Sequence, residues 1–147
     1  MKQTILDVAD WFLNRSPMSH KKLQKLCYYA EAWSETLLGE PISEEAEFEA
    51  WVHGPVNRMI WNKYRSYGWN EIQSVPLAPN FSEQKVEVLE SVWLTYHELS
   101  GTQLETLTHQ EAPWQKQRSG LTSFERSENR IRVEDMVDYY RSIYSGD

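Results

Sequence analysis

Four histidines are the residues of this chain best suited to metal binding or proton transfer. They are His20, His53, His97 and His109, and imidazole is both a metal ligand and a general base near neutral pH. No two of them form an H-x-x-x-H or H-E-x-x-H pair, the spacing that places ligands on one helix face. We therefore expect no metal ligands, and a small enzyme that uses His53 or His109 is kept as an alternative.

The other reactive side chains lie in patterns typical of structural roles. Cys27 stands in an apolar stripe, which predicts a buried thiol rather than a nucleophile. Gly54–Pro55 is a poor phosphate cradle because proline has no N–H, and no glycine-rich nucleotide motif occurs. The carboxylate pairs Glu44–Glu45 and Glu134–Asp135 fit a loop and a helix start. We expect no catalytic residue and no cofactor.

Charge is distributed unevenly along the chain. The net charge is −7, which disfavours binding to a phosphate backbone. Residues 1–30 contain five Lys or Arg and two Asp, whereas residues 31–50 contain seven Glu and no basic residue. The lysines of the segment 21–25, followed by Tyr28 and Tyr29, are too few for a convincing stacking patch. Direct nucleic-acid binding is therefore not expected.

Length and composition predict one globular domain over residues 1–147. A chain of 147 residues with 40% hydrophobic residues can bury a core of its own. A single cysteine excludes an internal disulfide and suits a reducing compartment. No apolar run approaches the ~20 residues of a membrane span, so we expect a soluble cytoplasmic protein.

Apolar periodicity and capping residues predict a mainly α fold. The expected structure is a single compact domain of about six helices with a small, short-stranded β element. A loop that is polar enough to be mobile is expected over residues 118–130, and residues 145–147 should fray. The predicted helices cover 5–13, Ser19 to Gly39, Pro55 to Gly68, Ser82 to near Gly101, a capping box at Thr102–Glu105 with the residues after it, a short turn at 114–118, and 136–144; a strand is expected within 46–53.

Four sequence blocks together resemble the Panacea antitoxin domain family, also described as SocA-like or GepA-like phage-associated domains. The blocks are Lys22-Leu23-Gln24-Lys25-Leu26 with the small and aromatic residues after it; Phe48, Ala50 and Trp51 with Gly54-Pro55-Val56; Leu107 to Trp114; and Glu134-Asp135-Met136 with Tyr139-Tyr140. The signature residues that we expect to specify the scaffold are Leu23, Leu26, Phe48, Ala50, Gly54, Pro55, Val56, His109, Pro113 and Trp114.

The resemblance implies an antitoxin of a type II toxin–antitoxin system that binds its cognate protein toxin directly. One family branch acts instead as an adaptor that delivers its toxin to a ClpXP-type protease, and this second role stays open. Tryptophan is enriched at binding hot spots, and three tryptophans follow the acidic segment 40–49. The expected toxin-binding residues are these tryptophans, Trp51, Trp61 and Trp69, together with His53. A homo-oligomer is also possible on this sequence.

Overall fold

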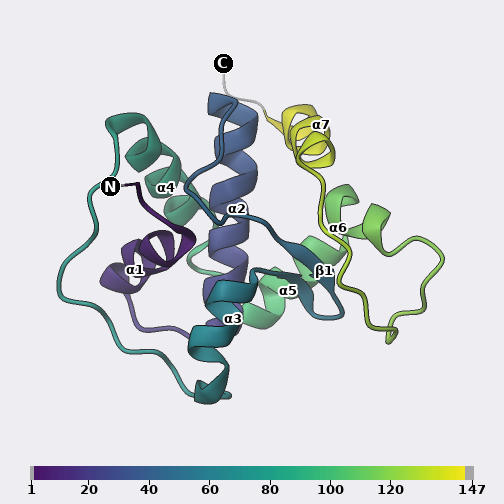
Figure 1. The fold of residues 1–147 in the computed structure, drawn as a ribbon, viewed down its shortest axis with the longest axis horizontal. Coiled ribbons are helices and arrows are strands. Elements are labelled where there is room, and N and C mark those ends of the chain that lie inside the picture. Colours follow the sequence, from purple (N-terminus) through teal and green to yellow (C-terminus); the bar gives the residue numbers. More distant parts are fainter. Residues whose placement is uncertain (1, 145–147) are drawn as a thin grey trace.

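Helix α2 is the axis of the fold, and the other elements pack around it (Figure 1). The structure is a computed structural model that describes residues 2–144, so the expected fraying of residues 145–147 lies outside it. It confirms the predicted mainly α class with a small β element, with seven α-helices in the described residues rather than about six. The elements are α1 (Ile5–Arg15), α2 (His20–Leu38), β1 (Glu49–Trp51), β2 (Gly54–Val56), α3 (Arg58–Tyr64), the 3-10 turn η1 (Arg65–Tyr67), α4 (Glu83–Tyr96), α5 (Gly101–His109), α6 (Ala112–Gln117) and α7 (Val133–Ile143).

The ends of α2 lie where the sequence predicts them. The Ser19 hydroxyl accepts a hydrogen bond from the Lys22 N–H at 3.2 Å, and Gly39 closes the helix in the left-handed region with φ 71°. Residues 23–32 between these caps are all buried. A helix that is buried on every side belongs to the centre of a fold, and α1, α4, α5 and α7 all pack against α2.

The region after β1 differs from the sequence prediction. Pro55 does not open a helix, because Gly54–Val56 forms strand β2, which pairs antiparallel with β1 so that Ala50 lies opposite Pro55. Val52 and His53 form the two-residue turn of this hairpin. The prediction was wrong because a three-residue strand carries no readable alternation. Helix α3 starts only at Arg58, after Asn57 caps it.

A second correction concerns the start of α5. The capping box is Ser100–Gln103 and not Thr102–Glu105, because the Ser100 hydroxyl accepts from the Gln103 N–H at 3.1 Å and the Gln103 side chain accepts from the Ser100 N–H at 2.9 Å. Both tetrapeptides fit the sequence pattern of a capping box. The helix therefore begins two residues earlier than expected, with Gly101 packed against the backbone of Lys22.

The polar segment 118–130 is irregular, as expected, but its base is anchored. The buried Arg118 guanidinium donates to the carbonyls of Ala50 at 3.2 Å and Thr122 at 3.1 Å. The end of the segment lies beside β1, where the Ala50 N–H donates to Asn129 O and the Ile131 N–H donates to Phe48 O, both at 2.8 Å. β1 therefore lies between β2 on one side and the end of this segment on the other.

The core contains polar side chains as well as apolar ones. Tyr28 and Tyr29 are buried beneath α4 and α7, so they offer no rings for nucleic-acid stacking. Cys27 is buried, as its position in the apolar stripe predicts. Within residues 2–144, no helix has the length and apolar character that crossing a membrane requires.

Candidate functional site

Two of the predicted toxin-binding residues lie against each other on the surface of the β-hairpin. The indole rings of Trp51 on β1 and Trp61 on α3 are 5.2 Å apart and inclined at 66°. His20, at the start of α2, places its ring 5.6 Å from that of Trp61. All three side chains are partly buried, so each has one surface on the protein and another in solvent.

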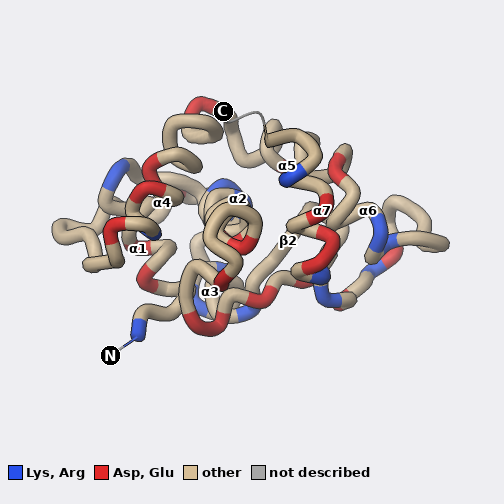
Figure 2. The backbone as a smooth tube through the Cα atoms, turned by 90° about the horizontal axis from the view of Figure 1, so that it is seen from above, with Lys and Arg blue, Asp and Glu red and all other residues tan. Residues whose placement is uncertain are grey.

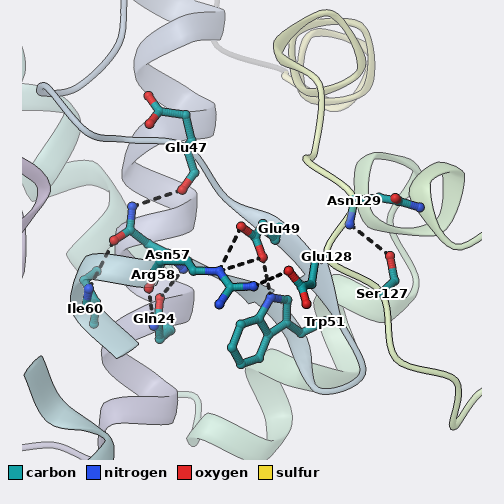
Figure 3. Close-up of polar contacts among 10 residues, drawn as sticks. All are labelled: Gln24, Glu47, Glu49, Trp51, Asn57, Arg58, Ile60, Ser127, Glu128 and Asn129. Atoms are coloured by element: carbon teal, nitrogen blue, oxygen red, sulfur yellow. Dashed lines mark hydrogen bonds and ion pairs between the residues drawn. The ribbon is translucent and has the colours of Figure 1, made fainter. Parts of the chain in front are cut away.

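Arg58 fixes the position of Trp51 from the solvent side, as Figure 3 shows. Its guanidinium carbon lies 5.3 Å from the centre of a Trp51 ring, a cation–π distance. Its Nε donates to Glu49 Oε2 at 3.2 Å and its terminal nitrogen to Glu128 Oε1 at 2.5 Å, and Glu49 also accepts from the Trp51 indole N–H at 2.8 Å. Hydrogen bonding with Glu49 raises the pKa of Arg58. We call Trp51, Arg58, Trp61 and His20 the hairpin face.

Asn57 joins the hairpin to α2 and to α3 (Figure 3). Its backbone N–H donates to Gln24 Oε1 at 2.8 Å, and its carbonyl accepts from Gln24 Nε2 at 3.0 Å. The Asn57 side chain accepts from the Ile60 N–H and donates to the carbonyls of Glu45 and Glu47. One buried side chain therefore sets both the start of α3, which carries Trp61, and the approach to β1, which carries Trp51.

His53 lies at the hairpin tip, and its side chain is 74% exposed. Its Nδ1 is 2.9 Å from Glu105 Oε2, and Lys21 pairs with the other oxygen of the same carboxylate. Burial opposes ionisation of Glu105, but hydrogen bonds from Lys21 and His53 lower its pKa. The dyad holds the imidazole in one orientation, an arrangement that could support proton transfer.

His109 supports the hairpin from the other side. Its ring stacks on Trp114 with centroids 4.0 Å apart, and the Trp114 indole N–H donates to the Trp51 carbonyl at 2.8 Å. Burial lowers the pKa of His109, and its Nε2 is buried without a hydrogen-bond partner in the described residues. The His109 side chain is half-buried, and its stack on Trp114 contributes packing behind the hairpin.

Comparison with known families matches residues 23–115 to the antitoxin SocA-like, Panacea domain model. The chain belongs to this family. No curated protein and no solved structure matches the chain. The matched segment runs from α2 to α6 and contains the hairpin face apart from His20. Outside it, α1 and α7 also pack on α2, and the extent of the Panacea domain over residues 1–147 stays a prediction.

Eight of the ten residues that we expect to specify the scaffold are buried, whereas His109 and Trp114 are half-buried. Leu23, Leu26, Phe48 and Ala50 are fully buried, and Gly54, Pro55, Val56 and Pro113 are buried in and behind the hairpin. Gly54 has φ 107°, and a Cβ there would lie 2.8 Å from Lys25 Cε. Only glycine accepts that backbone together with so close a neighbour.

Lys25 of the Panacea domain is a buried cation whose role the sequence did not reveal. Its side chain is 2% exposed, and its Nζ donates to the Pro55 carbonyl at 3.2 Å. Burial lowers the pKa of Lys25 to about 7. Lys25 belongs to the first sequence block and Pro55 to the second. Their hydrogen bond therefore connects these two blocks in the folded protein.

Trp69 is not part of the hairpin face. It follows η1, is 93% exposed, and forms no close ring pair with Trp51 or Trp61 among the described residues.

The sequence interpretation missed two residues that hold Trp51 in place, Arg58 and Glu128. Arg58 could have been suspected from its place between two tryptophans, but Glu128 lies 70 residues away from it, and no local pattern indicates that contact.

Proposed function

We propose that this chain is an antitoxin that neutralises a protein toxin by direct contact through the hairpin face. The proposal is supported by membership of an antitoxin family and by one structural observation, the partly exposed Trp51–Trp61 pair under Arg58. Tryptophan and arginine are the residue types most enriched among binding hot spots. The residues of this pair need little reordering on binding, because ion pairs and Asn57 already hold them in place.

Co-expression with the toxin tests this proposal. The toxin would be a growth-arresting protein encoded beside this chain, and the chain should restore growth. Trp61→Ala, alone or with Trp51→Ala, should abolish the rescue while the protein stays folded. Leu94→Ala is the matched control, because Leu94 is an exposed apolar side chain (72%) on α4. Full rescue by a folded double tryptophan variant would refute the hairpin face as the contact.

The amount of toxin in the cell distinguishes two mechanisms of neutralisation, blocking by direct binding and delivery to a protease. Blocking leaves the toxin abundant and inactive in a complex with this chain. An adaptor lowers the toxin level, and deleting a ClpXP-type protease restores it. We propose blocking, since a pre-formed aromatic surface favours a stable complex; a toxin that accumulates only without the protease would favour the adaptor.

An enzyme is the second candidate, and the His53–Glu105 dyad favours it. His53→Ala removes the exposed imidazole without opening a core cavity, because the side chain lies in solvent. Rescue should be unchanged if the chain is a binding protein. Loss of rescue together with retained toxin binding would support the enzyme.

A further inference from the structure

Residues 50–70 are a positively charged segment in a chain whose net charge is −7. They include Arg58, Lys63 and Arg65 and contain no Asp or Glu. Figure 2 shows acidic residues along α4 and α7 instead. The three cations of the segment lie on α3 and at the start of η1, so this end of the molecule is locally basic.

Four side chains of this segment lie along one side of α3. The spacing of Arg58, Trp61, Asn62 and Arg65 is three, four and seven residues from the first, which places them on one helix face. Arg65 keeps helical angles, with φ −58° and ψ −28°, so the face continues into η1. We call these four residues the α3 face. It shares Arg58 and Trp61 with the hairpin face and extends that surface towards η1.

Arg65 is an exposed cation without a carboxylate beside it. On α1 and α2, Arg15 and Lys21 pair with glutamates, and Lys22 and Lys25 donate to backbone carbonyls. Arg65 forms no salt bridge within residues 2–144. A guanidinium has five N–H donors in a planar fork that fits a carboxylate. Arg65 can therefore pair with a carboxylate of another molecule without breaking a pair of its own.

Arg58 offers a second position for a carboxylate on the same face. Its Nε and Nη2 donate to Glu49 and Glu128, whereas Nη1 donates to no group within residues 2–144. The Glu128 side chain is 75% exposed, so this surface pair can be exchanged at little cost. Seven residues of helix separate Arg58 from Arg65 by about 10 Å. An extended chain covers that distance in about three residues.

Exposed aromatic rings follow directly after the α3 face. Tyr67 is 39% exposed and Trp69 is 93% exposed. The turn that carries them is closed by its own hydrogen bonds, from the Gly68 N–H to the Arg65 carbonyl at 3.2 Å and from the Asn70 N–H to the Tyr67 carbonyl at 3.0 Å. Aromatic residues and arginine are both enriched at protein–protein interfaces. Ring exposure therefore points to a docked partner independently of the charge.

We propose that the α3 face binds a short acidic segment of a partner protein, in extended form, with two carboxylates three residues apart at Arg58 and Arg65. Nucleic acid is a poorer match, because a long polyanion would also meet the acidic segment 40–49 and the net charge of −7. That the partner is the toxin rests on the proposed function above. The α3 face itself can be tested without any toxin.

The test is an NMR titration of the whole chain at low ionic strength with three probes. They are the capped peptide Ac-Glu-Ala-Ala-Glu-NH2, its glutamine counterpart Ac-Gln-Ala-Ala-Gln-NH2, and a short oligothymidine. The glutamate peptide should bind saturably and shift the Trp61 indole signal and the Asn62 backbone signal. The glutamine peptide should bind at least about threefold more weakly, as expected for lost surface ion pairs, and added salt should reduce this difference.

Two variants with the same change of charge assign the effect to the α3 face. Arg65→Gln should remove most of the preference for the glutamate peptide over the glutamine peptide. Lys63→Gln is the matched control and should keep that preference, because Lys63 is exposed but lies off the face, with its Nζ 5.3 Å from the centre of the Tyr64 ring.

Four results would overturn the proposal. They are absence of binding, equal binding of the two peptides, an equal effect of the two variants, and tighter binding of the oligothymidine, which would indicate a nucleic-acid surface instead. The growth rescue that tests the proposed function depends on Trp51 and Trp61 and not on Arg65. Failure of the peptide titration therefore removes the acidic partner segment and leaves the proposed function to its own test.

Discussion

The molecule contains two aromatic clusters of similar chemistry and opposite placement. In the interior, Tyr29 and Tyr140 donate their hydroxyl protons to Glu111 Oε1 at 2.9 and 2.7 Å, and Tyr29 stacks on Tyr96 with centroids 4.0 Å apart. We call this the tyrosine cluster. On the surface, the hairpin face pairs Trp51 with Trp61 under Arg58. Both clusters are held by hydrogen bonds to carboxylates.

The two clusters differ in how much of each side chain is in contact with the rest of the protein. Each hydroxyl of the tyrosine cluster has a partner inside the protein, so these rings connect α2, α6 and α7 and contribute stability. The tryptophans of the hairpin face are only partly buried, and Arg58, which covers Trp51 from the solvent side, is itself exposed. We therefore expect changes in the tyrosine cluster to alter folding, and changes in the hairpin face to alter binding.

Glu111→Ala should give the largest loss of stability, about 3 kcal/mol in the free energy of unfolding, because it leaves the buried Tyr29 hydroxyl without an acceptor and leaves Tyr140 only the Tyr28 hydroxyl. Urea unfolding at pH 7 measures this loss. Gln110→Ala, a change at the exposed residue that follows α5 and precedes Glu111, should cost little stability. An equal effect of both variants would show that the tyrosine cluster is not a stabilising network.

The pH dependence of stability separates two other interior groups, Lys25 and Glu31. The folded-state pKa of Lys25, about 7, lies below its ordinary 10.5, so above pH 7 the unfolded state binds more protons and stability rises with pH. The pKa of Glu31 is raised above its ordinary 4.5, so the folded state binds more protons there and stability falls with pH. Each slope is at most about 1.4 kcal/mol per pH unit, and the two oppose each other.

Lys25→Met and Glu31→Gln should therefore change the pH profile in opposite directions. Between pH 7.5 and 9, Lys25→Met should lose stability as pH rises, and Glu31→Gln should gain it, relative to the unchanged chain. Urea unfolding at several pH values measures both slopes. Identical profiles for the two variants would mean that neither group is buried as the structure indicates.

Arg58→Gln should have the smallest effect, and only on binding. The Arg58 ion pairs lie in solvent, so the unfolding midpoint should stay unchanged, while toxin affinity should fall about fivefold because Trp51 is no longer held. Arg15→Gln is a matched control, since Arg15 also lies over a tryptophan, Trp11, and pairs with a glutamate. A similar loss of affinity in both variants would make the effect of Arg58 non-specific.

Local sequence signals predicted the helical frame and two residues of the candidate site. Ser19 and Gly39 bound α2 because caps act within one turn. Trp51 and Trp61 were found as candidates by residue type, whereas Trp69 shares that type but not the location. The hairpin was missed because β2 has three residues and includes a proline.

The interior partners could not be predicted in the same way. Glu111 meets Tyr29 across 82 residues of sequence, and Lys25 reaches the Pro55 carbonyl 30 residues ahead. Such contacts depend on how α2, α6 and the hairpin pack against one another. The hydrophobic periodicity of the sequence indicates local structure and gives no information about them. The family match over residues 23–115 contains or overlaps the first three blocks of the resemblance and leaves the fourth a prediction. The contact of Lys25 with the Pro55 carbonyl joins the first two blocks.

The most direct test of the central claim measures unfolding free energy and toxin affinity on the same set of variants. The double variant Trp51→Ala with Trp61→Ala should keep most of its stability and lose affinity by about 30-fold or more. Leu94→Ala should change neither quantity. A folded double variant that binds the purified toxin as tightly as the unchanged chain would contradict the account.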